Sequence, residues 1–275
     1  MEPEPTLVIE PSRGFRALDL RELWKSRELL FILAGRDVRL RYKQTALGIF
    51  WVVLQPLAAA LLFAAIFGRL AHLPSDGAPY TSFVFAGLLP WTLLSGAVQR
   101  SATSLVADSR LVSKVYFPRL LIPLSSAAAV LIDFGVSLLV MAALMAVQSV
   151  APTVRLLTLP FFLLLALAAA VGLGLWLSAL NVRYRDFMYA LPFLLQVWMF
   201  ASPVAWPTSL VPVHLRTLIA LNPAVGIIEG FRFALLGRGV LSLPMLAVST
   251  ATSLALLLSG ALFFRRVERS FADSL

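Results

Sequence analysis

The sequence predicts an all-α integral membrane protein with six transmembrane helices. Hydrophobic residues make up 60% of its 275 residues, charged residues only 13%, and the mean hydropathy is +0.88. A soluble domain has roughly 45–50% apolar and about 25% charged residues. Long charge-free windows also recur along the chain, and one helical span needs about 20 apolar residues. Several spans joined by short loops fill this length and leave no room for a large soluble domain.

Residues 1–45 are predicted to be a cytoplasmic segment that contains an amphipathic interface helix at about 18–42. Leu23, Phe31 and Val38 recur on one helical stripe, whereas Arg21 and Lys25 fall largely elsewhere. Such a helix can lie in the headgroup region with its cations toward anionic lipids. It could serve only as a membrane anchor or also take part in gating. The segment lacks an early apolar core with a small-residue cleavage site, so we expect it to remain uncleaved.

The transmembrane domain is expected over residues 46–265, followed by a cytoplasmic tail at 266–275. A helix rises about 1.5 Å per residue and must cross about 30 Å of hydrocarbon. Six segments meet this requirement, at about 46–69, 82–106, 121–147, 156–180, 187–206 and 243–264.

The lysines and arginines predict the orientation of these spans. Placing residues 1–45, 100–119, 181–186 and 265–275 on one side collects 18 of the 23 cations. Cytoplasmic loops carry the excess of Lys and Arg, so this side is expected to be cytoplasmic. With an even number of spans, both termini then lie inside.

The long external connection, residues 207–242, differs from a simple loop. Its charge-free stretch, 217–228, is too short to cross the membrane, and prolines and glycines interrupt the region. The pattern favours a re-entrant helical hairpin, which would sit at the outer mouth of a pathway because irregular backbone at membrane depth needs protein or water around it. An ordinary interfacial loop is the other interpretation. The hairpin residues singled out are Asn222, Glu229 and Arg232, the last two being spaced to pair on a helix.

Asp133 is the one acidic residue well inside a predicted span. A charged side chain there is costly and needs a partner or an aqueous cavity. Arg100, near the inner end of the second span, is the expected partner. The pair could hold two helices together, or Asp133 could line a conduit.

Aromatic residues are frequent in and beside the first, second and fifth spans. Aromatic faces suit the C–H faces of sugar rings, but aromatic residues also form belts at membrane interfaces and fill cores. The candidates for a substrate channel are Phe50, Trp51, Phe63, Phe67, Trp91 and Trp198.

The chain lacks the residues that several kinds of catalytic or binding site require. Without cysteine it has no disulfide and no thiolate metal site. Each of its three lysines follows a residue other than glycine, which excludes a P-loop, and His72 and His214 belong to no hydrolase motif. The net charge of +9 follows the predicted topology and does not indicate nucleic-acid binding. We therefore expect no catalytic residue, no bound metal and no cofactor of its own.

Two short cytoplasmic loops combine basic and aromatic residues. They read SRLVSKVYFP at 109–118 and NVRYRDF at 181–187. The positive-inside rule alone explains the charge, but arginine and aromatic residues are also favoured at protein interfaces. Both loops are candidates for docking surfaces.

Five strings together resemble one family. They are RDVRLRYKQTALGIFWVVLQP at 36–56, LVSKVYFPRLLIP at 111–123, LNVRYRDF at 180–187, SPVAWP at 202–207 and NP at 222–223. In this order they resemble the permease subunit of type-2 ABC exporters for cell-surface polysaccharides, the group that serves O-antigen, capsule and teichoic acid export.

The resemblance implies a multi-pass subunit of the bacterial inner membrane that forms a homodimer and works with two copies of a separate ATPase, which binds ATP and Mg. A lipid-linked polysaccharide, O-antigen above all, would pass outward through a channel at the dimer interface. The residues implied in coupling to the ATPase are Trp24, Arg27, Arg36, Lys114, Tyr116, Phe117, Arg183, Tyr184, Arg185 and Asp186. Two alternatives share part of the pattern: a type-2 exporter of a drug or another lipid, and a membrane enzyme acting on lipid-linked sugars.

Overall fold

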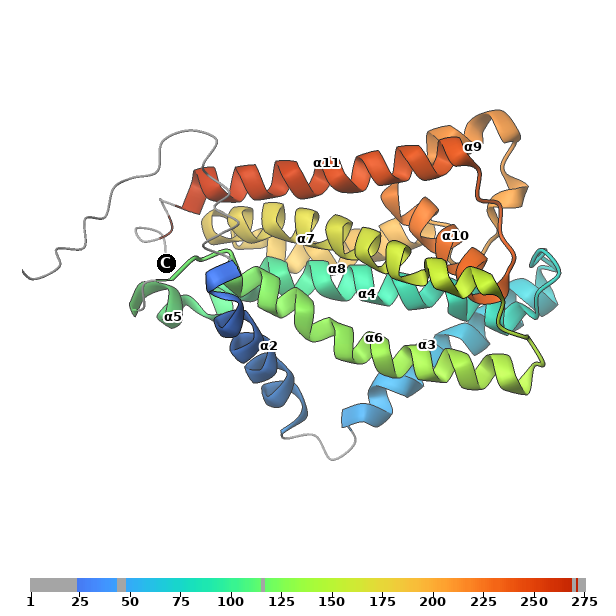
Figure 1. Ribbon diagram of the computed structural model, residues 1–275, viewed down its shortest axis with the longest axis horizontal. Coiled ribbons are helices and arrows are strands. Elements are labelled where there is room, and N and C mark those ends of the chain that lie inside the picture. Colours follow the sequence, from blue (N-terminus) through green and yellow to red (C-terminus); the bar gives the residue numbers. More distant parts are fainter. Residues whose placement is uncertain (1–23, 44–47, 115–116, 269–270, 272–275) are drawn as a thin grey trace, which may run out of the picture.

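The computed structural model describes residues 24–43, 48–114, 117–268 and 271, and every regular element in these ranges is a helix (Figure 1). This confirms the predicted all-α class. Five helices are long and apolar enough to cross a membrane, or six if one bent pair is counted as a span. The chain is therefore a multi-pass membrane protein.

The long helices follow the predicted spans closely. The third predicted span, 121–147, coincides with α6, and most other boundaries differ by a few residues. The long helices are α3 (Gly48–Phe63), which continues as the π-helix η2 (Ala64–Leu70), α4 (Tyr80–Ala107), α6 (Leu121–Val147), α7 (Leu159–Arg183), preceded by the 3-10 turn η3 (Val154–Thr158), and α11 (Leu243–Val267).

The fifth predicted span, 187–206, is wrong in extent. Helix α8 (Asp186–Phe200) has 15 residues and covers about 22 Å, short of the roughly 30 Å of hydrocarbon. After Phe200 the apolar chain forms turns over residues 201–206, where Pro203 lacks the backbone N–H that a continuing helix would use. Hydropathy alone counted these turns as part of the span.

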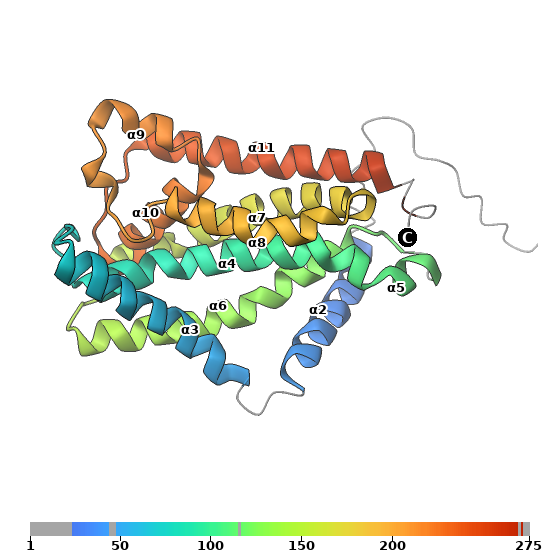
Figure 2. The same ribbon diagram turned by 180° about the vertical axis from the view of Figure 1, so that it is seen from behind.

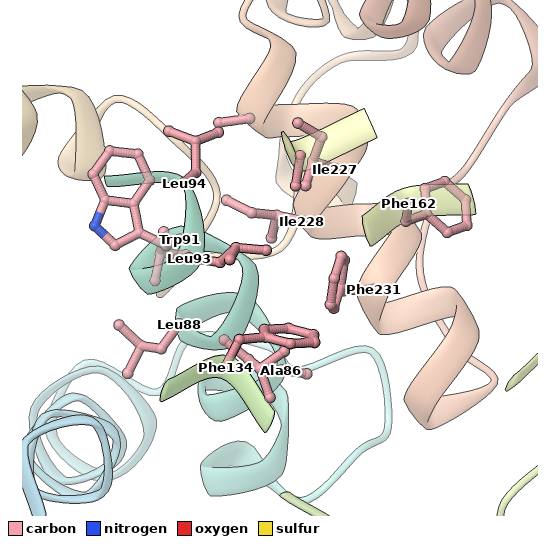
Figure 3. Packing of buried hydrophobic residues seen from close by; sticks show 14 of the residues in the cluster. Ala86, Leu88, Trp91, Leu93, Leu94, Phe134, Phe162, Ile227, Ile228 and Phe231 are labelled. Atoms are coloured by element: carbon pink, nitrogen blue, oxygen red, sulfur yellow. The ribbon is translucent and has the colours of Figure 1, made fainter. Parts of the chain in front are cut away.

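Helix α4 lies at the centre of the bundle and packs against α3, α6, α7 and α10 (Pro223–Leu236) (Figure 2). Most of its side chains are buried. Phe134 of α6 and Phe231 of α10 meet edge to face, with ring centroids 6.0 Å apart, beside Ala86 of α4 (Figure 3). This geometry is one that aromatic pairs prefer, and it joins three helices in one core.

Two glycines allow α7 and α11 to pack closely along each other. A Cβ at Gly172 would overlap the backbone of α11 at Leu256, and a Cβ at Gly260 would overlap the backbone of Gly172. Small residues at a crossing let helix backbones approach within a membrane. Next to the crossing, Trp176 stacks on Phe263 with ring centroids 3.9 Å apart.

The segment between α8 and α11 contains two helices, α9 (Val213–Ile219) and α10, bent by 112° relative to each other. Asn222 caps α10 by accepting a hydrogen bond from the Ala224 amide, and Pro223 occupies the first turn, where its missing N–H costs nothing. Gly237 ends the helix with a positive φ of 64°. The predicted proline and glycine punctuation thus marks real helix ends, while the membrane depth of the pair stays a prediction.

The N-terminal helix α2 (Arg27–Tyr42) packs against α6. Its buried residue is Leu33, whereas Phe31 of the predicted apolar stripe is exposed, as is Trp24 just before the helix. An interfacial helix needs apolar residues that are free of the rest of the chain to contact lipid. The upstream part of the predicted helix, residues 18–23, lies outside the described residues, as do residues 269–270 and 272–275 of the predicted tail.

Candidate functional site

A polar cavity of about 680 Å³ lies between α3, α4 and α6. Helix α4 contributes a stripe of polar residues at helical spacing, which includes Thr92, Gln99 and Thr103. Gln55 of α3 and Ser137 of α6 face the same space. Polar side chains at membrane depth favour a pathway or a binding site over a lipid-facing surface.

Asp133 of α6 lines this cavity and is held by two residues of α2. Its Oδ2 accepts a hydrogen bond from the Arg41 guanidinium, and its Oδ1 accepts one from the Tyr42 hydroxyl. Arg100, the predicted partner, lies farther away, with Nη2 4.0 Å from Oδ2. The expected pairing is thus present but secondary, because α2 folds back against α6 and brings in residues more than 90 positions away.

A second ionic cluster fixes the other part of α2. Arg36 Nη2 donates to Asp108 Oδ2 at 2.5 Å and to Asp37 Oδ1 at 2.7 Å, and the Ser126 hydroxyl donates to Asp37 Oδ2 at 3.0 Å. Partial burial opposes the charged form of Arg36, but the hydrogen bonds to both carboxylates raise its pKa. This predicted coupling residue therefore connects α2 to the end of α4, and its neighbour Asp37 connects α2 to α6.

The other predicted coupling segments gather at one end of the molecule, where α5 (Ser109–Lys114) and the α7–α8 connection lie (Figure 1). Trp24 and Arg27 are exposed, with the Arg27 guanidinium 5.3 Å from the Trp24 ring centroid. Phe117 is half-buried against the core near Leu105. The exposed residues of the second loop are Arg183, Tyr184, Arg185 and Asp186. The side chain of Lys114 and all of Tyr116 lie outside what the structure describes.

The six aromatic channel candidates fall into different environments. Phe50 and Trp51 of α3 are 51% and 50% exposed. Phe63 and Phe67 pack edge to face with centroids 5.7 Å apart. Trp91 is only 5% exposed yet borders the cavity, and Trp198 of α8 meets it edge to face at 5.4 Å.

Helix α8 presents exposed aromatic residues that the sequence analysis did not single out. Tyr189 and Phe193 belong to a largely uncovered apolar face of this helix. In the sequence these two residues appear only as part of a fifth span that is rich in aromatic residues. Only the weak packing of α8 against the rest of the bundle shows that this face is free in one chain.

Two of the predicted hairpin residues, Glu229 and Arg232, form a buried ion pair at the opposite end. Arg232 Nη1 donates to Glu229 Oε1 at 2.9 Å, which confirms the predicted pairing three residues apart. Asn222 Oδ1 accepts a hydrogen bond from Trp198 Nε1 at 2.8 Å, so it joins the end of α8 to the start of α10.

These features define a class: a multi-pass helical membrane protein with a polar cavity inside its bundle and basic loops at one end. Comparison with known families narrows this class. Residues 28–236 match the family described as ABC-2 type transporter, and the chain belongs to this family. The family resemblance drawn from the sequence is thereby confirmed.

Several curated proteins are similar over nearly the whole chain. The O-antigen export system permease protein RfbA of Myxococcus xanthus is 30% identical over 93% of this chain and 98% of its own length. The protein of the same name from Klebsiella pneumoniae is 25% identical over 90% of this chain and 95% of its own length. The polysialic acid transport protein KpsM of Escherichia coli is 27% identical over the same shares.

Proposed function

We propose that this chain is the transmembrane permease subunit of an ATP-driven exporter that moves a lipid-linked polysaccharide, with O-antigen the best-supported cargo, across the bacterial inner membrane. The observation that carries the proposal is the similarity over at least 90% of the chain to proteins named for O-antigen export and polysialic acid transport. A match of this extent includes the loops and the segment between α8 and α11 as well as the long helices.

In this proposal two copies of the chain form the channel between them, with α3 and α8 facing the partner copy. Both helices carry large apolar side chains that the single chain leaves uncovered, among them Trp51, Leu62 and Phe193. The polar cavity opens beside α3, so a pathway at this interface would offer both polar groups and aromatic faces to a glycan.

The energy for transport comes from a separate ATPase subunit, two copies per exporter, which binds ATP and Mg. The end that carries α5 and Arg183–Asp186 is the docking surface and faces the cytoplasm with both termini. The α9–α10 pair forms a re-entrant hairpin at the outer mouth. Helix α2 lies in the inner interface and follows the movement of the ATPase through its ionic contacts with α4 and α6.

Deletion of the gene in its own host tests whether the exported substrate is a polysaccharide. We expect loss of the polysaccharide from the cell surface, measured with an antibody or lectin, together with accumulation of lipid-linked polymer inside. The chain supplied from a plasmid should restore display, but only in the presence of an ATPase subunit able to hydrolyse ATP. Normal surface polysaccharide combined with lost efflux of a drug or another lipid would replace this proposal by the alternative cargo.

The assembly is tested by native mass spectrometry of the complex purified with its ATPase. Two permease chains and two ATPase chains are expected, and ATP hydrolysis should be absent from the permease alone. A monomeric permease in the intact complex would contradict a channel formed between two copies.

A further inference from the structure

The cavity between α3, α4 and α6 is lined by exposed residues at its opening and by buried residues further inside. Gln55 and Gln99 line it and are themselves exposed, whereas Ser137 and Phe134 behind them are buried. Amide side chains exposed at membrane depth are unfavourable against hydrocarbon. The opening therefore requires water or a polar ligand.

Cations outnumber anions among the residues that line this cavity, although Asp37 of α2 attracts Arg100 from outside the lining. The ionisable residues of the lining are Arg41, Arg100 and Asp133, which gives two cations and one anion. Asp133 is already engaged by Arg41 and Tyr42. Arg100 stays 4.0 Å from the carboxylate, and within the described part of the chain its guanidinium has no hydrogen-bond acceptor.

Arg100 lies within the candidate membrane span of α4, seven residues before its end, or about 10 Å along the helix axis. A guanidinium at that depth is stable only beside water or an anion. Several hydroxyl groups on the same stripe donate to backbone carbonyls of their own helix, such as Ser95 to Trp91 and Thr92 to Leu89. Arg100 and the two glutamines are therefore the main free donors.

We propose that Arg100, assisted by Gln55 and Gln99, binds the phosphoryl group of an anionic lipid in this cavity. A guanidinium presents several donors in a planar fork that matches two phosphoryl oxygens, and amide donors can complete the shell. The volume of about 680 Å³ is ample for one such headgroup. The exposed rings of Phe50 and Trp51 on the same helix as Gln55 offer an apolar path for the lipid chain.

Two sources carry this chemistry: a phosphoryl-linked carrier lipid of the transported glycan, and an ordinary bilayer phospholipid. The first source rests on the proposed export function, while the second does not. The test therefore separates them.

Binding is measured on the purified full-length chain in nanodiscs made of zwitterionic lipid. The probe is farnesyl diphosphate, with farnesol as the control for simple partition of the apolar tail. We expect the diphosphate to bind saturably and farnesol not to. Arg100→Gln should weaken binding about ten- to hundredfold, because a charged hydrogen-bonded contact is lost. Arg100→Lys should restore part of the affinity.

Arg69→Gln is the matched control, because Arg69 is exposed on η2 and does not line the cavity. Its affinity for the probe should equal that of the unaltered chain. If Arg100→Gln does not fold, Gln55→Leu replaces it, since Gln55 is exposed and should weaken binding about threefold to tenfold on losing one amide donor.

Competition identifies the source. Displacement of the probe by lipid diphosphates but not by phosphatidylglycerol supports a carrier-lipid site, and equal displacement by both supports a general phospholipid site. Unchanged affinity in folded Arg100→Gln and Gln55→Leu would overturn the proposal. Because binding is read without transport, a chain that binds the probe but exports no polysaccharide would refute the proposed function and leave this site intact.

Discussion

The guanidinium of Arg232 lies over the ring of Phe83, 3.6 Å from its centroid, and both side chains are buried. The same guanidinium donates to the Val204 carbonyl at 2.8 Å and pairs with Glu229. Glu229 in turn accepts hydrogen bonds from the Thr208 hydroxyl at 2.7 Å and from the Val240 amide at 3.1 Å. One ion pair thus connects α10 with the start of α4 and with the segments on both sides of the α9–α10 pair.

Removing one member of this pair should be more harmful than removing both. Glu229→Gln or Arg232→Met leaves a buried charge without its partner and should cost roughly 3–5 kcal/mol in the free energy of unfolding. The double variant should cost less than either single variant, because it leaves no unpaired buried charge. Unfolding in mixed micelles titrated with a denaturing detergent measures these values, and strict additivity would show that the two charges are not coupled.

The crossing of α7 and α11 predicts opposite effects for one and the same substitution. Gly172→Ala adds a Cβ that overlaps the backbone at Leu256, so overpacking should cost about 1–3 kcal/mol. Gly135→Ala in α6 is the matched control, because no atom lies within 4 Å of its added Cβ. There the variant should be neutral or slightly more stable, since alanine favours helix. Thermal unfolding of the purified variants checks both, and equal midpoints would contradict the close approach.

Two predicted channel aromatics should behave differently. Trp91→Ala empties a buried site and should destabilise the fold by about 3–5 kcal/mol. Trp51→Ala should leave stability almost unchanged, since half of its side chain is exposed, but reduce export if α3 faces the channel. Export measured at equal membrane levels of the two proteins separates packing from transport. Full export by Trp51→Ala would remove this residue from the channel.

A substitution on the proposed docking surface should uncouple ATP hydrolysis from export. Arg183 is exposed at the α7–α8 connection, so Arg183→Ala should fold normally. We expect the complex to hydrolyse ATP while export falls at least severalfold, because the movement of the ATPase no longer reaches α8. ATP hydrolysis and export are measured on the same preparation.

Arg69→Ala, an exposed arginine at the opposite end, is the control for that experiment and should preserve both activities. Normal export by Arg183→Ala would count against docking at this loop. Loss of both activities in Arg183→Ala would instead indicate failed assembly of the complex.

The fold class and most helix positions could be predicted from the sequence, because crossing a bilayer imposes a minimum length of apolar helix. The ends of α10 were marked by Asn222–Pro223 and Gly237, where local backbone chemistry decides. The fifth span was overestimated because hydropathy does not register that the apolar chain turns over residues 201–206, at Pro203. Local spacing likewise predicted the pairing of Glu229 with Arg232, but not its complete burial.

The partners of Asp133 depended on tertiary structure. Sequence reasoning could identify an acid that needs a cation, and it named Arg100 from the expected antiparallel packing of two spans. The fold placed Arg41 and Tyr42 closer, since α2 packs back on α6.

The sequence by itself determined that this chain is an integral membrane protein and which family it resembles. Only the tertiary structure decided which cation lies closest to Asp133, because contacts between distant residues follow from helix packing and not from spacing along the chain.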